Sequence, residues 1–293
     1  MTMSTTSAAR PGGPPTALMY LLMTLVGAAA FLYPFWLPAE GGAATAHSAD
    51  APLVAAVIGA LVVATLALEV RRGTMNGASV ALLAVLATLT GMLRLLDLPG
   101  GGSGLFFLAV LAGVAFGPRF GVLLGLAAMA TSALLTGGVG PWLPFQMLGL
   151  AWMAGGAGLL GRLTARLPPA VEVVVVASYA WVWGFIYGAI LNLWFWPFIT
   201  GDGPTAWQPG LGLDETISHY WAFYVSTSLA WDAAGATTNA VLILITGVAV
   251  LRTLRRFSSR LSPVVELVDL APPEALALST VEDLPTRRRC QNR

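Results

Sequence analysis

Charged side chains that could bind a ligand lie inside long apolar stretches of this sequence. Arg94 and Asp97 are spaced i,i+3, so they share one face of a predicted helix. An ionisable group at membrane depth is costly and is a functional candidate by default. The two residues either neutralise each other, or Arg94 is a cation for an anionic or carbonyl-rich ligand.

A second polar group lies on the last apolar stretch. Ser228, Asp232, Gly235 and Asn239 recur at spacings of four, three and four residues, which places them on one helical face. In a membrane helix this face must point into the bundle interior. Asp232 therefore either binds substrate or pairs with Arg94 as a structural tie.

Aromatic residues are concentrated in one part of the chain. Of the 16 Trp and Tyr residues, 11 lie between Tyr179 and Trp231. Two series of rings are predicted to align on helix faces: Tyr179, Trp183 and Tyr187, and then Tyr220, Tyr224 and Trp231. These rings either line a pocket for a large, partly aromatic ligand or pack between helices and at the membrane interface.

Several chemistries are excluded by residues that the chain lacks. All 15 basic residues are arginine, so the chain has no lysine for a Walker A loop or a Schiff base. Cys290 is the single cysteine, and His47 and His219 are the only histidines, so we expect no metal site and no cofactor. Gly101–Gly104 contains a G-x-S-G string in which Ser103 could pair with His219, and an intramembrane serine protease is the remote enzymatic alternative. We expect a protein that is not an enzyme.

The elements that must position these residues are membrane-spanning helices. Hydrophobic residues make up 57% of the 293 residues and charged residues only 10%, and the mean hydropathy is +0.77. The fold class predicted is therefore an all-α polytopic membrane protein. Eight spans are expected, at 17–38, 53–70, 78–98, 105–117, 119–137, 142–161, 171–198 and 219–251. The fourth is short, so its ends should lie in protein, and the eighth should either rise above the membrane between His219 and Tyr224 or bend near Gly235.

Arginine positions predict the orientation of these spans. With both termini in the cytoplasm, 14 of the 15 arginines lie on the inner side, and Arg94 is the exception. A cleavable signal peptide ending near Ala44–Ala46 is the alternative for the first span, but the aromatic run Tyr33–Trp36 favours a retained helix. Residues 1–16 and 257–293 are polar and are expected to be disordered tails, although four arginines between Arg252 and Arg260 could hold anionic lipid or a partner.

Small residues form a stripe on the third span. Its members alternate by four and three residues: Gly77, Ala81, Ala84, Thr88 and Gly91. Such a stripe lets a second helix approach closely in lipid. The second helix belongs either to this chain or to a partner subunit. Gly121 and Gly125 repeat the pattern on the fifth span.

Three stretches of this sequence resemble one family of membrane proteins. They are residues 105–161, which include FFLAVLAGVAFGPRFGVLLG and SALLTGGVGPWLPFQMLGLAWMAGGAGLLG, then NLWFWPF at 192–198 and HYWAFYVSTSLAWD at 219–232. Their order and spacing resemble the substrate-binding S-component of energy-coupling factor (ECF) vitamin transporters, in particular an actinobacterial, cobalamin-type subgroup. The resemblance covers residues 78–256.

The resemblance implies a six-helix vitamin-binding core at 78–256, preceded by two extra helices at 17–70 whose role it does not explain. It also implies a bacterial plasma-membrane location, a transmembrane coupling subunit and two cytoplasmic ATPase subunits as partners, and no nucleic-acid partner. The small-residue stripe would contact the coupling subunit, although it departs from the strict AxxxA pattern. The vitamin is expected to be cobalamin or another large heterocycle.

Depth and chemistry select the residues expected to bind the vitamin. They are Arg94, Trp142, Gln146, Trp183, Tyr187, Asn192, Tyr224 and Asp232. A proton-coupled secondary transporter that acts alone through Asp232 is the alternative function.

Overall fold

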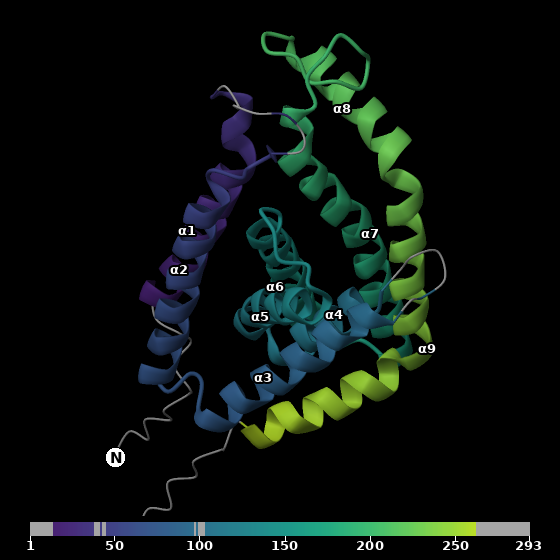
Figure 1. Cartoon of the computed structure of the whole chain (residues 1–293). Coiled ribbons are helices and arrows are strands. Elements are labelled where there is room, and N and C mark those ends of the chain that lie inside the picture. Colours follow the sequence, from purple (N-terminus) through teal and green to yellow (C-terminus); the bar gives the residue numbers. More distant parts are fainter. Residues whose placement is uncertain (1–13, 38–41, 43–44, 97, 99–102, 262–293) are drawn as a thin grey trace, which may run out of the picture. The chain divides into compact units, whose positions relative to one another are not determined.

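The computed structural model describes residues 14–37, 42, 45–96, 98 and 103–261, and these residues are almost entirely helical. The helices are α1 (Pro14–Leu32), α2 (Ala51–Arg71), α3 (Gly77–Met92), α4 (Leu105–Phe116), α5 (Pro118–Thr136), α6 (Leu143–Thr164), α7 (Pro169–Phe195), α8 (Leu213–Thr227) and α9 (Leu229–Leu261) (Figure 1). Within this part of the chain there is no strand of more than one residue, and Thr200 and Trp207 form an isolated bridge. Seven of the helices are long and apolar enough to cross a membrane, so the chain is an all-α, multi-span membrane protein.

The short helix α4 lies at the centre of the bundle. Five helices contact it, namely α3, α5, α6, α7 and α9. Residues Ala109 to Ala112 are completely buried, which explains how a 12-residue helix is stable although it is too short to span a bilayer. Gly117 turns the chain from α4 into α5 with a φ of 91°, a conformation that disfavours residues with a Cβ, and Pro118 then begins α5.

Glycines let α4, α5 and α6 pack backbone against backbone. A Cβ on Gly113 or Gly121 would overlap the carbonyl group of Ala154 on α6, and a Cβ on Gly125 would lie 2.6 Å from the Cα of Ala151. Close approach of this kind drives helix association in lipid. The small residues of the fifth span therefore serve packing within the chain.

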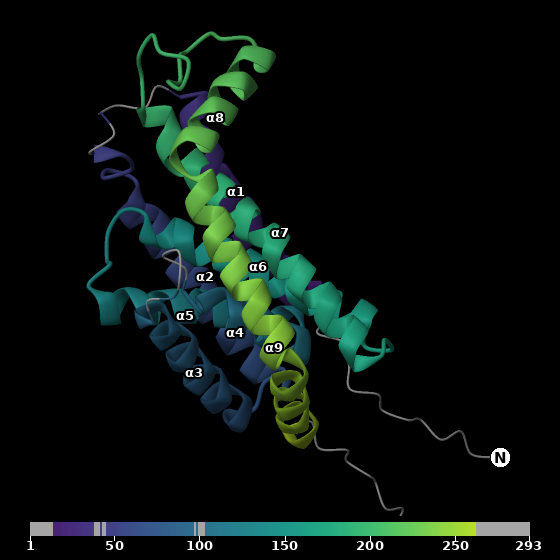
Figure 2. The same cartoon turned by 90° about the vertical axis from the view of Figure 1, so that its right-hand side faces the viewer.

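The eighth predicted span is replaced by two helices. The break lies at Ser228, between α8 and α9, and the expected bend near Gly235 is wrong because Gly235 lies within α9. The hydroxyls of Ser226 and Thr227 bond back to the Phe223 carbonyl and compete for backbone acceptors at the end of α8. Figure 2 shows α8 followed by α9 along α7.

The last helix continues to Leu261, ten residues beyond the expected end at 251. Arg255 holds this extension by a bidentate ion pair with Glu172 of α7, with Nη1–Oε2 and Nη2–Oε1 distances of 2.7 and 2.5 Å. Thr164 of α6 donates a further hydrogen bond to Glu172. Residues 262–293 of the predicted tail lie outside the described residues, as do residues 1–13.

The two N-terminal helices, α1 and α2, lie side by side and are tied to α5, α6 and α7 (Figure 1). At one end, Glu69 of α2 accepts a hydrogen bond from Tyr20 of α1 and forms an ion pair with Arg119 of α5, with an N–O distance of 3.7 Å. Midway, Gly27 packs against Leu148 and Trp152 of α6. The pair is thus an integral part of the bundle.

At the other end, His47 attaches the α1–α2 connection to α7. Its ring is 2% exposed, its Nδ1 lies 2.7 Å from Asp50 Oδ2, and its Nε2 lies 3.1 Å from the Trp194 carbonyl oxygen. The ring also stacks on Trp194 and contacts Phe145 and Phe198. His47 therefore links the N-terminal pair to α6 and α7.

Replacing His47 by alanine is expected to lower the stability of the bundle by about 2–4 kcal/mol, because it removes two hydrogen bonds and leaves a cavity among three rings. The measurement is the thermal unfolding midpoint of the purified protein in detergent. His219→Ala is the control, since His219 is only partly buried and its described hydrogen-bond partner is one carbonyl. Equal midpoints for the two variants would contradict the structural role of His47.

Candidate functional site

The antiparallel pair α7 and α9 positions the main polar cluster. Going along α7, Gly184 meets Ala236, Gly188 meets Asp232, and Asn192 meets Ser228. Successive contacts are four residues apart on both segments, and they run in opposite directions along the chain because the two segments are antiparallel. A Cβ on Gly188 would overlap the Asp232 carboxylate, so this carboxylate rests directly on the α7 backbone.

Asp232 and Tyr224 carry the unpartnered polar atoms of this cluster. The Asp232 Oδ2 and the Tyr224 hydroxyl are buried, and neither has a hydrogen-bond partner within 3.5 Å. The two groups lie near enough to each other to interact as a side-chain pair. Beside them, Asn192 donates to Ser228 Oγ at 2.8 Å, and the Tyr220 hydroxyl donates to the Ala189 carbonyl. Buried polar groups without a partner are rare in proteins, and each requires an explanation.

Arg94 lies elsewhere, and it does not pair with Asp232: no Arg94–Asp232 ion pair is formed within 4 Å. Its Nη1 lies 3.3 Å from Met129 Sδ on α5, and its charge acts on the Tyr187 hydroxyl. The structural tie between Arg94 and Asp232 is therefore not formed. The alternative pairing of Arg94 with Asp97 involves a residue outside the described ones.

The first series of rings packs on α6. Tyr187 covers Gly149 and meets Phe106 at a centroid distance of 4.7 Å, and the Tyr179 hydroxyl donates to the Met153 carbonyl at 2.7 Å. Trp183 lies near Gly156. These contacts explain the positions of Tyr179 and Trp183 by helix packing. Tyr187 also lies within electrostatic range of Arg94.

The second series is divided by the break at Ser228. Tyr220 and Tyr224 of α8 are partly or fully buried, but Trp231 on α9 is 69% exposed. The expected alignment of these three rings is therefore wrong, because it assumed one continuous helix.

Two further predicted residues lie at the start of α6. Trp142 is 40% exposed, and its Nε1 donates to the Gly138 carbonyl of its own loop. Gln146, one turn further along, has a buried Oε1 without a hydrogen-bond partner. The predicted residues thus occupy four places: Arg94 and Tyr187; Trp183, which packs on α6; Trp142 and Gln146; and Asn192, Tyr224 and Asp232.

The small-residue stripe on α3 lies on one face of the helix, and only its C-terminal end is covered by α5. Four of its residues are exposed, namely Gly77, Ala81, Ala84 and Thr88. Gly91 is buried, and a Cβ there would lie 3.0 Å from the backbone nitrogen of Ser132 on α5. Most of the stripe is thus open to a neighbour outside this chain.

Asn239 has a structural role. It is 1% exposed, its Oδ1 accepts from the Phe107 amide at 2.7 Å, and its Nδ2 donates to the Ser103 carbonyl at 2.9 Å. It therefore fixes the start of α4. His219 lies 20 residues before Asn239, which is roughly 30 Å along the two helices, so His219 and Ser103 do not form a catalytic pair.

Gly184 and Gly188 were missed by the sequence analysis. They form a G-x-x-x-G pattern on α7, which is a known signal for close helix packing and could have indicated the face that meets α9.

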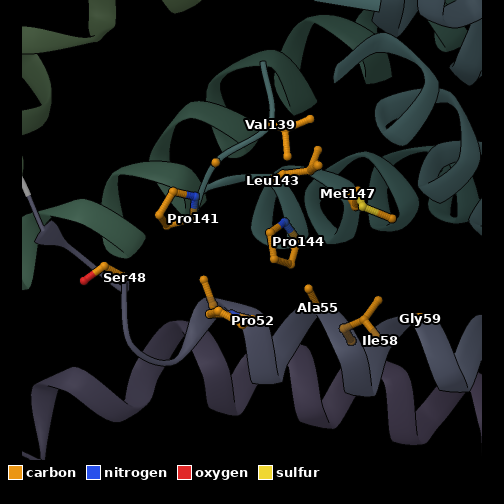
Figure 3. A pocket seen from close by; sticks show the side chains of 12 residues that line it. Ser48, Pro52, Ala55, Ile58, Gly59, Val139, Pro141, Leu143, Pro144 and Met147 are labelled. Carbon is orange, nitrogen blue, oxygen red and sulfur yellow. The ribbon is translucent and has the colours of Figure 1, made fainter. Parts of the chain in front are cut away.

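Two cavities are lined by residues that are not among the predicted vitamin-binding residues. One, of about 330 Å³, lies between α2 and the start of α6 (Figure 3), and another, of about 440 Å³, lies between the end of α1 and the start of α8.

In the described part of the chain, no group of three His, Cys, Asp or Glu residues could hold a metal ion. The chain matches no protein-family model, no curated protein and no solved structure.

Proposed function

We propose that this protein is the membrane-embedded, substrate-binding subunit of an ECF-type importer, which captures a vitamin from outside. The observation that carries the proposal is a set of buried polar atoms without partners. Gln146 at the start of α6 has such an atom, and so do Tyr224 and Asp232, which interact with each other at the separate α7–α9 contact. An unsatisfied polar atom is costly in a membrane bundle, and a polar ligand would supply the missing hydrogen bonds.

The exposed part of the α3 stripe supports a partner subunit. Gly77, Ala81, Ala84 and Thr88 present little side-chain volume on an open face, so a helix of a coupling subunit could approach closely there. Because the chain has no lysine for a P-loop, ATP would be hydrolysed by two separate cytoplasmic subunits. The proposed location is the bacterial plasma membrane, with both termini in the cytoplasm.

Ligand retention by the purified protein tests the proposal. We expect a vitamin, with cobalamin as the first candidate, to co-purify and to be identified by mass spectrometry, and to rebind with a Kd below about 1 μM. Absence of any retained vitamin, together with no binding below that concentration, would contradict the proposal.

A bulky residue at Ala84 is expected to reduce docking of the coupling subunit about ten-fold or more without loss of vitamin binding, because it blocks close helix approach. The variant is Ala84→Leu, and the measurement is co-purification of the partner subunits from cells that express the whole transporter. Val85→Leu, at the neighbouring exposed position, is the control. Normal assembly with Ala84→Leu would exclude the stripe as the docking face.

The second candidate is a proton-coupled transporter that acts alone. The observation in its favour is the Asp232 carboxylate, which has a buried, unpartnered oxygen and no basic partner among the described ion pairs. Carboxylates of this kind are used in proton relays. Transport by the isolated chain in liposomes that depends on a pH gradient would favour this candidate, whereas transport that requires partner subunits and ATP favours the importer.

A further inference from the structure

The second N-terminal helix, α2, contributes one wall of the cavity shown in Figure 3. On one side lie Ala55, Ile58 and Gly59 of α2, and on the other lie Val139, Pro144 and Met147 of the loop before α6 and of α6 itself. The cavity therefore depends on the attachment of α2 to α6. Neither the predicted binding residues nor the proposed vitamin-binding role involves it.

The lining is apolar with one polar end. Ser48 is the one residue of the lining with a polar side chain, and Figure 3 shows it at the end opposite Gly59 and Met147. Pro52 and Pro144 each lie in the first turn of a helix, where the ring fits the backbone without strain. Their fixed φ angles make this part of the wall rigid, so the cavity is preformed.

The lining also determines which kind of molecule fits. Water is disfavoured because a buried water needs two to four polar partners. A vitamin ring system needs several well-placed polar groups for orientation, and the lining offers one hydroxyl. A hydrocarbon chain needs none, and a cavity of about 330 Å³ has room for a segment of such a chain.

We infer that this cavity binds one acyl chain of a membrane phospholipid, with the polar part of the lipid toward Ser48. The helices that line most of the cavity, α2 and α6, are both long and apolar enough to cross the membrane, so the acyl chains of the bilayer are the apolar molecules nearest to it. The bound chain fills the space between α2 and α6 and so stabilises the attachment of the N-terminal helices. A ligand that binds the folded state alone raises stability in proportion to the logarithm of its concentration.

Gly59 offers a direct test. A Cβ on Gly59 meets no atom within 4 Å, so a leucine there enters the cavity without a clash with the protein. Ala60→Leu is the matched control, because Ala60 is exposed on the same helix and is not part of the lining. The full chain is purified in detergent, delipidated, and titrated with palmitoyl-oleoyl phosphatidylglycerol, and bound lipid is counted by native mass spectrometry.

We expect the unmodified protein and Ala60→Leu to retain one phospholipid and to gain thermal stability on titration, and Gly59→Leu to bind it at least ten-fold more weakly. Equal retention in all three proteins would overturn the inference. Loss of vitamin retention with unchanged phospholipid retention in Gly59→Leu would also overturn it, because the cavity would then belong to the substrate site. If Gly59→Leu is not obtained folded, Ala55→Leu fills the same cavity from one turn away and carries the same expectations.

Discussion

Replacing Gly121 by alanine is expected to lower the stability of the bundle by about 3 kcal/mol, with a thermal midpoint about 6–12 °C lower in detergent. The physical reason is that the added methyl group would overlap the Ala154 carbonyl and lie 3.1 Å from the Gly155 nitrogen, so α5 and α6 must move apart. Backbone atoms cannot rotate away as a flexible side chain does. The loss of close packing also opens the core around α4.

Gly235→Ala is the matched control for this prediction. Gly235 lies inside α9, and a Cβ there meets nothing within 4 Å, so the change should raise stability slightly through helix propensity. A similar midpoint for the two alanine variants would mean that α5 and α6 do not pack as closely as described.

Replacing Asp232 by asparagine is expected to weaken vitamin binding about ten- to hundred-fold, because a hydrogen bond to a charged group contributes about 1.5–3 kcal/mol. Asparagine has nearly the same shape, so the packing of α9 on Gly188 is retained and the protein should remain folded. The measurement is the Kd for the vitamin, with the thermal midpoint recorded alongside. Asp214→Asn, at an exposed position in the first turn of α8, is the control.

Gly188→Ala tests the same cluster by a different change. It leaves the Asp232 side chain itself unchanged but displaces its carboxyl group, because the new methyl group would occupy the position of that group. Binding should fall in this variant as well. Full vitamin affinity in both Asp232→Asn and Gly188→Ala would show that Asp232 does not contact the ligand.

Some conclusions followed from the sequence because they depend only on residue composition and on the lengths of apolar stretches. The 57% of hydrophobic residues and the recurrence of apolar stretches predicted an all-α membrane protein, and seven helices of sufficient length and hydropathy confirm it. The short fourth helix was also predictable, since its length is bounded by Gly117 and Pro118. The absence of lysine excludes a P-loop in this chain whatever its fold.

Helix boundaries at the last span were not predictable to the same degree. The break at Ser228 depends on hydroxyls that bond back to the end of α8, and a hydropathy average over the segment does not register them. The extension of α9 to Leu261 depends on the ion pair of Arg255 with Glu172, two residues that are 83 positions apart in sequence.

The pairing of residues was decided by the tertiary structure alone. The sequence left Asp232 free to pair with Arg94, but α7 and α9 pack in a register that places Asp232 on Gly188 and leaves Arg94 beside Met129. The same applies to the α3 stripe, where α5 covers the end of the stripe at Gly91 and leaves Ala84 exposed. Composition and periodicity show which face of a helix is apolar, small or polar. Which other helix packs on that face depends on close packing between segments that are far apart in the chain.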